Sequence, residues 1–363
     1  MSWLKIAGGI EALESLDLDA GLVARCERLA APRGIRFHTP SFKTYASSEI
    51  ASCGRHEWPA VSITGADCKL QCDHCKGRVL GSMIAARSPG ELWRVAQELI
   101  ARGAKGMLLS GGSNHRDEVE YGPFLPVVRR IKDARPDFRV ALHTALVDAG
   151  MARAVEAAGV DAAMLDVIGA QDTVSQVYHL RRPVEDFARS LEHLLATSLK
   201  VVPHIVLGLH YGRMLGEWRA LEMIARHRPA ALVLVAAMPI YASDKRPFAT
   251  LPAREIGAFF LDARAALPAT PLLLGCARPA GRARSEIDAY AVMAGLEGIA
   301  HPSEGAVELA LALGREVTVS PACCSIALDG ASVALSDAAS VRVDPRLLAR
   351  ARRPIERIPV VER

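Results

Sequence analysis

The chain has 363 residues, enough to bury a large core in one large domain or two smaller ones. Its residues are 50% hydrophobic and its net charge is only +4, which excludes a strongly basic nucleic-acid binder but suits a mildly acidic protein partner. Its apolar runs are too short to span a bilayer, and acidic residues near the start do not fit a signal peptide. We therefore expect a cytoplasmic protein without membrane or nucleic-acid partners, whose eight cysteines do not form a disulfide framework.

From about residue 60, short β-branched runs alternate with longer amphipathic runs. Strands are expected at 60–68, 105–113, 138–144, 161–169, 200–210, 230–238, 270–279 and 297–302. Helices are expected at 88–104, 121–137, 149–159, 183–198, 215–227, 252–267, 284–296 and 304–316. In the first of these helices, Ser88 is the expected N-cap and Pro89 takes the first helical position.

Eight strand–helix pairs with near-continuous apolar strands predict an α/β fold with a parallel sheet covered on the outside. We interpret it as a closed (β/α)8 TIM barrel over residues 59–315, with a doubly wound open sheet as the alternative. An N-terminal extension over residues 1–58 contains a helix near 10–30. A C-terminal tail over residues 316–363 contains the sequence PACCS.

Three cysteines, Cys68, Cys72 and Cys75, follow the first strand in the sequence GADCKLQCDHCKGRV. On a barrel this loop lies at the C-terminal face, where active sites occur. Three thiolates at this spacing can hold three irons of a [4Fe–4S] cluster and leave the fourth iron open. The alternatives are a Cys3His zinc site that includes His74, and three buried structural cysteines. The position at a strand end favours the cluster.

The CxxxCxxC motif after the first strand of a βα barrel resembles the radical S-adenosylmethionine (SAM) superfamily. The resemblance implies that the open iron binds the amine and carboxylate of SAM. An electron from the cluster then cleaves SAM to methionine and a 5′-deoxyadenosyl radical, which abstracts hydrogen from an unactivated carbon. Cys68, Cys72 and Cys75 would accordingly be catalytic residues as well as metal ligands.

Other strand ends carry the same resemblance. Ser110, Gly111 and Gly112 resemble the glycine pair whose backbone approaches the amine of SAM, with Ser113 standing where the superfamily has an acidic residue. Asp166 ends the fourth strand and is expected either to face SAM or substrate, or to be an ordinary strand-end cap.

The segment over residues 204–212 resembles the fifth-strand region that lies against adenine, so Gly208 is a further candidate for cofactor binding. Packing and turning are the alternative role for Gly208 and Gly212. His143 and His210 also lie at strand ends, as catalytic, hydrogen-bonding or structural histidines.

The remaining cysteines divide by position. Cys276 ends the seventh strand, and Cys323 and Cys324 form an adjacent pair in the tail. A tail that folds back over the barrel would join these three as ligands of an auxiliary [4Fe–4S] cluster, with small buried cysteines as the alternative. Cys53 precedes the first strand and is placed toward the opposite rim, and Cys26 is the weakest candidate.

The full barrel, GCARP after the seventh strand and HTPSFKTY before the barrel resemble the biotin synthase and lipoyl synthase branch, especially a subunit of the two-protein lipoyl synthase of archaea and some bacteria. This implies a sulfurtransferase of lipoate biosynthesis that inserts sulfur at C6 or C8 of a protein-bound octanoyl chain. Cys276, Cys323 and Cys324 would hold the sulfur source, with Arg278 or Ser325 as candidates for a fourth ligand. The implied partners are an octanoylated acyl-carrier domain (a lipoyl domain or the glycine cleavage H protein), a sister radical SAM subunit, and a reductant such as ferredoxin or flavodoxin.

The chain lacks the CxxxxCxxxxxC motif of the single-chain lipoyl synthase and the auxiliary-cluster pattern of biotin synthase. One alternative is another radical SAM reaction on a small molecule, such as a biotin synthase-like sulfur insertion, a mutase reaction or a methylation. A second is a non-enzymatic iron–sulfur or zinc protein. Counts of iron and sulfide distinguish these alternatives.

Overall fold

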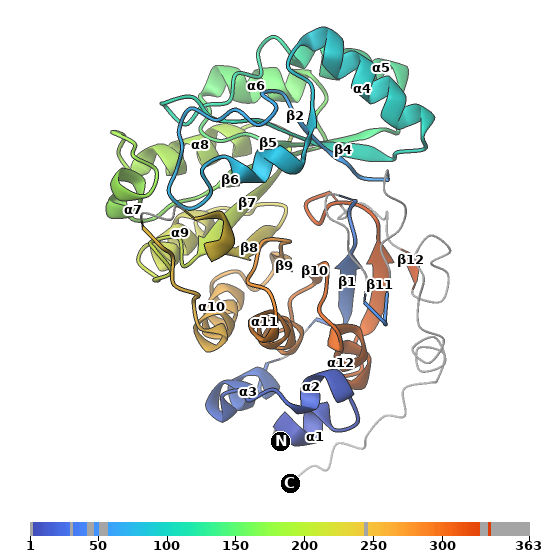
Figure 1. The fold of residues 1–363 in the computed structure, drawn as a ribbon, viewed down its shortest axis with the longest axis vertical. Helices are drawn as coiled ribbons and strands as arrows, with labels where there is room; N and C mark the ends of the chain where they lie inside the picture. Colours follow the sequence, from blue (N-terminus) through green and yellow to red (C-terminus); the bar gives the residue numbers. More distant parts are fainter. Residues whose placement is uncertain are drawn as a thin grey trace.

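The computed structural model describes residues 3–29, 32–41, 47–50, 57–242, 246–326 and 333–334. Within these residues, twelve strands form one sheet in the order β12-β11-β1-β10-β9-β8-β7-β6-β5-β4-β2-β3 (Figure 1). The strands are β1 (Gly34–His38), β2 (Ala60–Ser62), β3 (Ile84–Ala85), β4 (Gly106–Ser110), β5 (Arg139–His143), β6 (Ala162–Asp166), β7 (Lys200–Leu207), β8 (Leu232–Ala236), β9 (Leu272–Leu274), β10 (Gly298–Ala300), β11 (Glu316–Ser320) and β12 (Val333–Ala334). The eight predicted strands are confirmed as β2 and β4 to β10.

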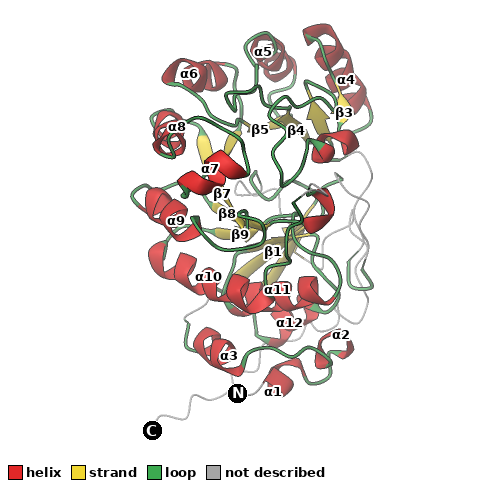
Figure 2. Ribbon diagram, turned by 60° about the vertical axis from the view of Figure 1, so that its left-hand side comes forward, coloured by secondary structure: helices red, strands yellow, loops and turns green. Residues whose placement is uncertain are grey.

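The eight predicted helices also form, and they cover the outer face of the sheet (Figure 2). They are α4 (Pro89–Ala101), α5 (Leu125–Ala134), α6 (Ala149–Ala157), α8 (Glu185–Leu195), α9 (Glu217–Ala225), α10 (Ala253–Ala266), α11 (Arg282–Met293) and α12 (Ala306–Ala312), with a short α7 (Gln171–Gln176) after β6. Ser88 caps α4 as predicted, since its hydroxyl accepts a hydrogen bond from the N–H of Glu91 at 3.2 Å. No helix among the described residues has both the length and the apolar character needed to cross a membrane.

The sheet is a partial barrel rather than a closed one. Neighbouring strands are parallel except for β11 and β12. A closed barrel would pair β10 with β2, but β1 occupies that edge of β10, with Arg36 opposite Gly298. The extension and the tail therefore supply β1 and β11, which pair with each other and lengthen the sheet.

The start of the chain forms α1 (Trp3–Ala7), α2 (Glu11–Glu14) and α3 (Ala20–Glu27). The single helix predicted near residues 10–30 is therefore two helices, α2 and α3. Asp19 caps α3 by accepting from the N–H of Leu22 at 2.8 Å, and its own N–H donates to the hydroxyl of Tyr290 on α11. These helices thus pack on the outer helical layer (Figure 1). The division into an extension, a barrel and a tail stays a prediction.

The tail after β11 returns to the inner face of the sheet. Ala322, Cys324 and Ile326 are buried in one apolar cluster with Met164 on β6 and Val233 on β8. Burial of this apolar surface holds the tail inside the partial barrel. The tail therefore reaches the region at which the strands end.

Candidate functional site

A cavity of about 360 Å³ lies at the carboxyl ends of the parallel strands. In α/β barrels this is the face at which active sites occur. The loop after β2, the inner faces of β4 to β8, the loop after β9 and the tail after β11 form its walls. All the predicted site residues except Gly208 line it: Cys68, Cys72, Cys75, Ser110, Gly111, Gly112, Asp166, Cys276, Cys323 and Cys324.

The loop over residues 63–77, here called the cysteine loop, packs tightly against the end of β4. A Cβ atom at Gly112 would lie 2.0 Å from the carbonyl oxygen of Asp67 and 2.6 Å from the Cα atom of Cys68, so only glycine fits there. The thiol of Cys68 lies 3.8 Å from the carbonyl oxygen of Ser113. The predicted glycine pair and the predicted cluster cysteines therefore share one wall of the cavity.

A buried carboxylate holds the cysteine loop in place. Asp73 accepts a hydrogen bond from Nζ of Lys76 at 2.7 Å, lies 3.1 Å from Nε2 of His179 and lies 3.0 Å from the hydroxyl of Tyr211. Burial opposes its ionisation, but these three partners lower the pKa of Asp73. The φ angles of Lys76, His179 and Tyr211 are 48°, 58° and 55°, which non-glycine residues seldom adopt. The network fixes the loops after β2, β6 and β7 against one another.

The thiols of the cysteine loop lie close enough for their negative charges to repel one another when they ionise. Burial raises the pKa of Cys72 well above its usual value, and the neighbouring Cys75, Asp117 and Cys68 raise it further. Burial also opposes ionisation of Cys75, but the charge and hydrogen bond of His74 outweigh it and lower the pKa of Cys75. A bound cation would relieve the repulsion among the thiolates.

This donor set fits a three-cysteine [4Fe–4S] cluster, because soft thiolates suit iron–sulfur centres and the cavity lies open beside them. His74 lines the same wall. No three of the ligand atoms of Cys68, Cys72, Cys75 and His74 lie within 4.8 Å of one another, as the ligands of a single zinc ion do, so the geometry does not support the Cys3His zinc alternative.

Asp117 is a candidate that the sequence analysis missed. It lines the cavity, and its exposed fraction is 6%. Burial raises the pKa of Asp117 to about 6, although a hydrogen bond from Ser113 lowers it. It lies four positions beyond Ser113, at the positive φ angle of 56°. The chain turns back within this loop and brings an acidic group to the wall at which the sequence shows only Ser113.

A second polar group comes from three adjacent strands. His143 ends β5, Asp166 ends β6, and His204 on β7 is the register partner of Asp166. Burial opposes ionisation of Asp166, but the charge of His143 outweighs it and lowers the pKa of Asp166 to about 2. Burial lowers the pKa of His204 to about 4. The carboxylate is therefore charged and His204 neutral near pH 7.

The predicted auxiliary-cluster cysteines meet at the cavity. Cys276 follows β9, and the tail carries Cys323, Cys324 and Ser325 to the same space. A hydrogen bond from the Cys324 thiol lowers the pKa of Cys323 to about 7, and the same contact raises the pKa of Cys324. Ser325 lines the cavity beside these cysteines, so it remains a candidate for a fourth ligand.

Arg278, the other candidate for a fourth ligand, is engaged elsewhere. Its Nε and Nη2 atoms donate to the carboxylate of Asp288 at 2.6 and 2.9 Å. The remaining donors bond to the carbonyl oxygens of Gly275, Ala300 and His301, each at 2.8 Å. All five N–H donors of the guanidinium are thereby used. Arg278 is a buried clamp between the loops after β9 and β10.

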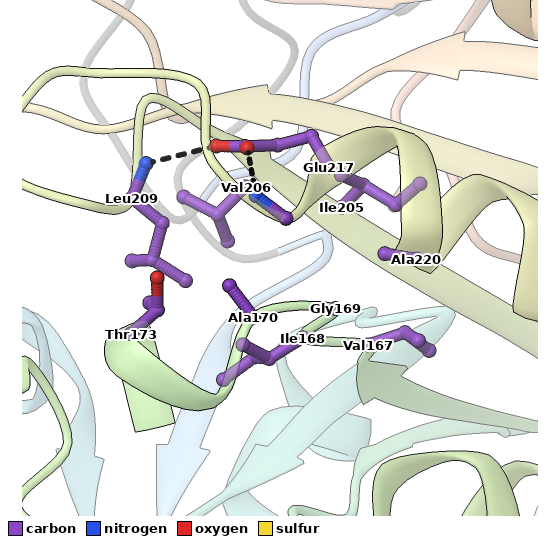
Figure 3. A pocket seen from close by; sticks show the side chains of 11 residues that line it. Val167, Ile168, Gly169, Ala170, Thr173, Ile205, Val206, Leu209, Glu217 and Ala220 are labelled. Carbon is purple, nitrogen blue, oxygen red and sulfur yellow. Dashed lines mark hydrogen bonds between the residues drawn. The ribbon is translucent and has the colours of Figure 1, made fainter. Parts of the chain in front are cut away.

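Gly208 does not line this cavity. Its N–H donates to Oε1 of Glu217 at 2.9 Å. The N–H of Leu209 donates to the same oxygen at 3.3 Å, beside a small hollow of about 10 Å³ (Figure 3). The φ angle of Gly208 is 74°, and a Cβ atom there would lie 3.3 Å from Cβ of Leu251. The geometry favours the turning and packing role for Gly208.

The other candidates lie away from the cavity. His210 is not among its lining residues, and Gly212 packs on the backbone of Ala249. Cys26 is buried in α3, where burial raises its pKa to about 11. Cys53 lies outside the described residues.

Comparison with known proteins tests the predicted fold. No family model matches this chain, and no curated protein matches it significantly. The structure of HydG, a maturase of the [FeFe]-hydrogenase, is similar over 80% of this chain and 63% of its own, at 15% identity and a TM-score of 0.54. The structure of HydG from Carboxydothermus hydrogenoformans is similar over 91% of this chain and 79% of its own, at 13% identity and a TM-score of 0.54. These likenesses confirm the predicted TIM-like α/β fold.

Proposed function

We propose that this chain is a radical SAM enzyme that forms a 5′-deoxyadenosyl radical in the 360 Å³ cavity. The observation that carries the proposal is the presence of Cys68, Cys72 and Cys75 on one cavity wall, packed against Gly112. A [4Fe–4S] cluster held there would supply an electron to SAM, which splits into methionine and the radical.

The surrounding residues suit that reaction. The backbone at Ser110 and Gly111 lines the cavity beside the cysteines, where it can approach the amine of SAM. Asp166 is charged near neutral pH and can accept a hydrogen bond from SAM or from substrate. Apolar side chains such as Val233 and Val235 line the far wall and exclude water from a reactive radical.

We further propose sulfur insertion into a protein-bound octanoyl chain, as in a lipoyl synthase subunit. The presence of Cys276, Cys323 and Cys324 at the same cavity supports a second cluster that would serve as the sulfur source. Ser325 is the better candidate for its fourth ligand, because the donors of Arg278 are used. The proposed partners remain an octanoylated lipoyl domain or H protein, a sister radical SAM subunit, and ferredoxin or flavodoxin.

The test is single turnover under anaerobic conditions. Reconstituted protein receives SAM, dithionite and hexanoyl-, octanoyl- or decanoyl-lysyl carrier, with and without the sister subunit. We expect a thiolated octanoyl product and transfer of deuterium from C6 or C8 into 5′-deoxyadenosine. Removing two methylene groups should weaken binding by about 1.6 kcal/mol, roughly tenfold. If no carrier gains sulfur or accelerates SAM cleavage, the lipoyl assignment is wrong while the radical SAM assignment stands.

A second candidate is a radical SAM reaction on a small polar molecule. Asp117, His143, Asp166 and His204 all line the cavity, and such a set suits a polar substrate better than an aliphatic chain. Iron analysis separates the candidates, because this alternative does not require sulfide from a second cluster.

A further inference from the structure

The side chains of His143, Asp166 and His204 project into the cavity from three adjacent parallel strands. Asp166 lies opposite His204 in the register of β6 and β7, and His143 lies opposite Met164 in the register of β5 and β6. Because side chains alternate along a strand, Met164 and Asp166 share a face. The three polar side chains therefore stand on the same inner face of a rigid sheet.

The spacing of their polar atoms matches a coordination site. One ligand atom from each side chain lies within 4.8 Å of the other two. Nε2 of His143 and Oδ1 of Asp166 are 3.6 Å apart, an ion-pair distance that is too long for a hydrogen bond. Two ligands of a tetrahedral ion with bonds of about 2.1 Å lie about 3.4 Å apart. The pair is thus spaced like two ligands of one ion, and a small side-chain shift brings in His204.

A second contact prepares His204 for the same role. Its Nδ1 atom lies 3.0 Å from the carbonyl oxygen of Val202. A carbonyl oxygen can only accept, so Nδ1 carries the proton and Nε2 keeps its lone pair. Histidines that bind metals usually donate their other ring N–H to such an acceptor, which fixes the tautomer and the ring orientation.

We propose that His143, Asp166 and His204 bind one divalent transition-metal ion, with zinc as the preferred ion. Two imidazoles and one carboxylate suit zinc or iron(II) rather than magnesium or calcium, and zinc binds such sites more tightly than iron(II). Three protein ligands leave a position open to the cavity for water or a substrate oxygen. Asp166 needs one oxygen for the ion, so its other oxygen stays available to SAM or substrate. The site uses none of the cysteines and stands independently of the proposed function.

The direct test is crystallography of the wild-type protein with zinc. Diffraction data collected just above and just below the zinc absorption edge locate zinc even where iron is present. The expected result is anomalous density among the three side chains. Zinc density only at the cysteines, or no zinc density, would overturn the proposal.

Solution measurements on variants provide the second test. Zinc affinity and stoichiometry are measured by competition with a chelating indicator for the wild type, H143A, H204A, D166N and H115A. His115 is exposed and away from the cavity, so H115A keeps the same cysteines and serves as the matched control. Each site variant should bind one zinc ion fewer than the wild type. The loss of zinc affinity at this site should exceed the 10- to 100-fold that is typical when a residue hydrogen-bonded to a metal ligand is removed.

D166N keeps the shape of the side chain and therefore tests charge if an alanine variant fails to fold. Magnesium added in place of zinc should not bind with comparable affinity. Unchanged zinc stoichiometry in folded H204A and D166N would contradict the proposal, because the remaining zinc would then belong to thiols common to all variants.

Discussion

Two groups of cysteines reach the same cavity by different routes. Cys68, Cys72 and Cys75 fall within eight consecutive residues of one loop, which a network around Asp73 holds. The second group joins Cys276 with a pair in the tail, and depends on burial of that tail inside the sheet. When all the ligands lie within one loop, their spacing in the sequence is enough to predict the site. A set assembled from distant segments exists only once the fold has formed.

The largest expected effect is at the loop. Replacing Cys72 with alanine should abolish binding of the first cluster and reduce SAM cleavage to background, because three thiolates are the minimum for a site with one open iron. Mössbauer spectra of reconstituted protein should keep the signal of a second cluster. Full iron content with normal SAM cleavage in this variant would show that the loop is not the ligand set.

The second group, Cys276, Cys323 and Cys324, should affect iron content but not SAM cleavage. Replacing Cys276 with alanine should lower the iron content from about eight to about four per chain and leave 5′-deoxyadenosine formation in place. Iron and sulfide analysis measures this change. A wild-type count near four, unchanged by Cys276→Ala and Cys323→Ala, would remove the second cluster and the sulfur source.

The network beneath the loop should show a smaller effect. Asp73→Asn keeps the size but removes the charge that faces Lys76 and His179, and should cost about 1–3 kcal/mol in unfolding free energy. It should also lower occupancy of the loop cluster but not of the tail cluster. Denaturant unfolding and Mössbauer spectra measure both.

The control for that variant is Asp137→Asn, which breaks an exposed ion pair with Arg135 and should change stability by less than about 1 kcal/mol. Equal losses in the two variants would show that the Asp73 network has no special part in holding the loop.

The smallest effect is expected at Gly208, outside both cysteine groups. Gly208→Ala forces a side chain into a positive φ angle beside Leu251 and should destabilise the fold by about 1 kcal/mol without altering SAM cleavage. Gly103 has a positive φ angle with open space around it, so Gly103→Ala isolates the backbone cost. A loss of SAM affinity in Gly208→Ala alone would restore Gly208 as a cofactor-binding residue.

The sequence predicted those parts of the fold that local patterns determine. Apolar runs and helical periodicity located eight strands and eight helices, and Ser88 marked the first helix. The open barrel was not predictable, because it depends on the pairing of β1 with β10 across most of the chain. No local pattern distinguishes that short strand from a loop segment.

Parts of the site were likewise predictable from local sequence patterns, and other parts were not. The CxxxCxxC spacing and the glycine pair were readable in the sequence, and a tail that folds back over the barrel to meet Cys276 was anticipated. Asp117 was missed because the loop after β4 doubles back, and His204 because one histidine in an apolar strand does not reveal its neighbours. The register of β6 and β7 supplies that information.

The central claim is that the cysteine loop supports reductive cleavage of SAM. The most direct measurement is anaerobic incubation of reconstituted protein with SAM and dithionite, with 5′-deoxyadenosine and methionine quantified by mass spectrometry. The account predicts equal amounts of both products from the wild type and neither above background when Cys68, Cys72 and Cys75 are all replaced by alanine. Equal rates of SAM cleavage in the two proteins, or none in wild type that carries its full iron, would contradict it.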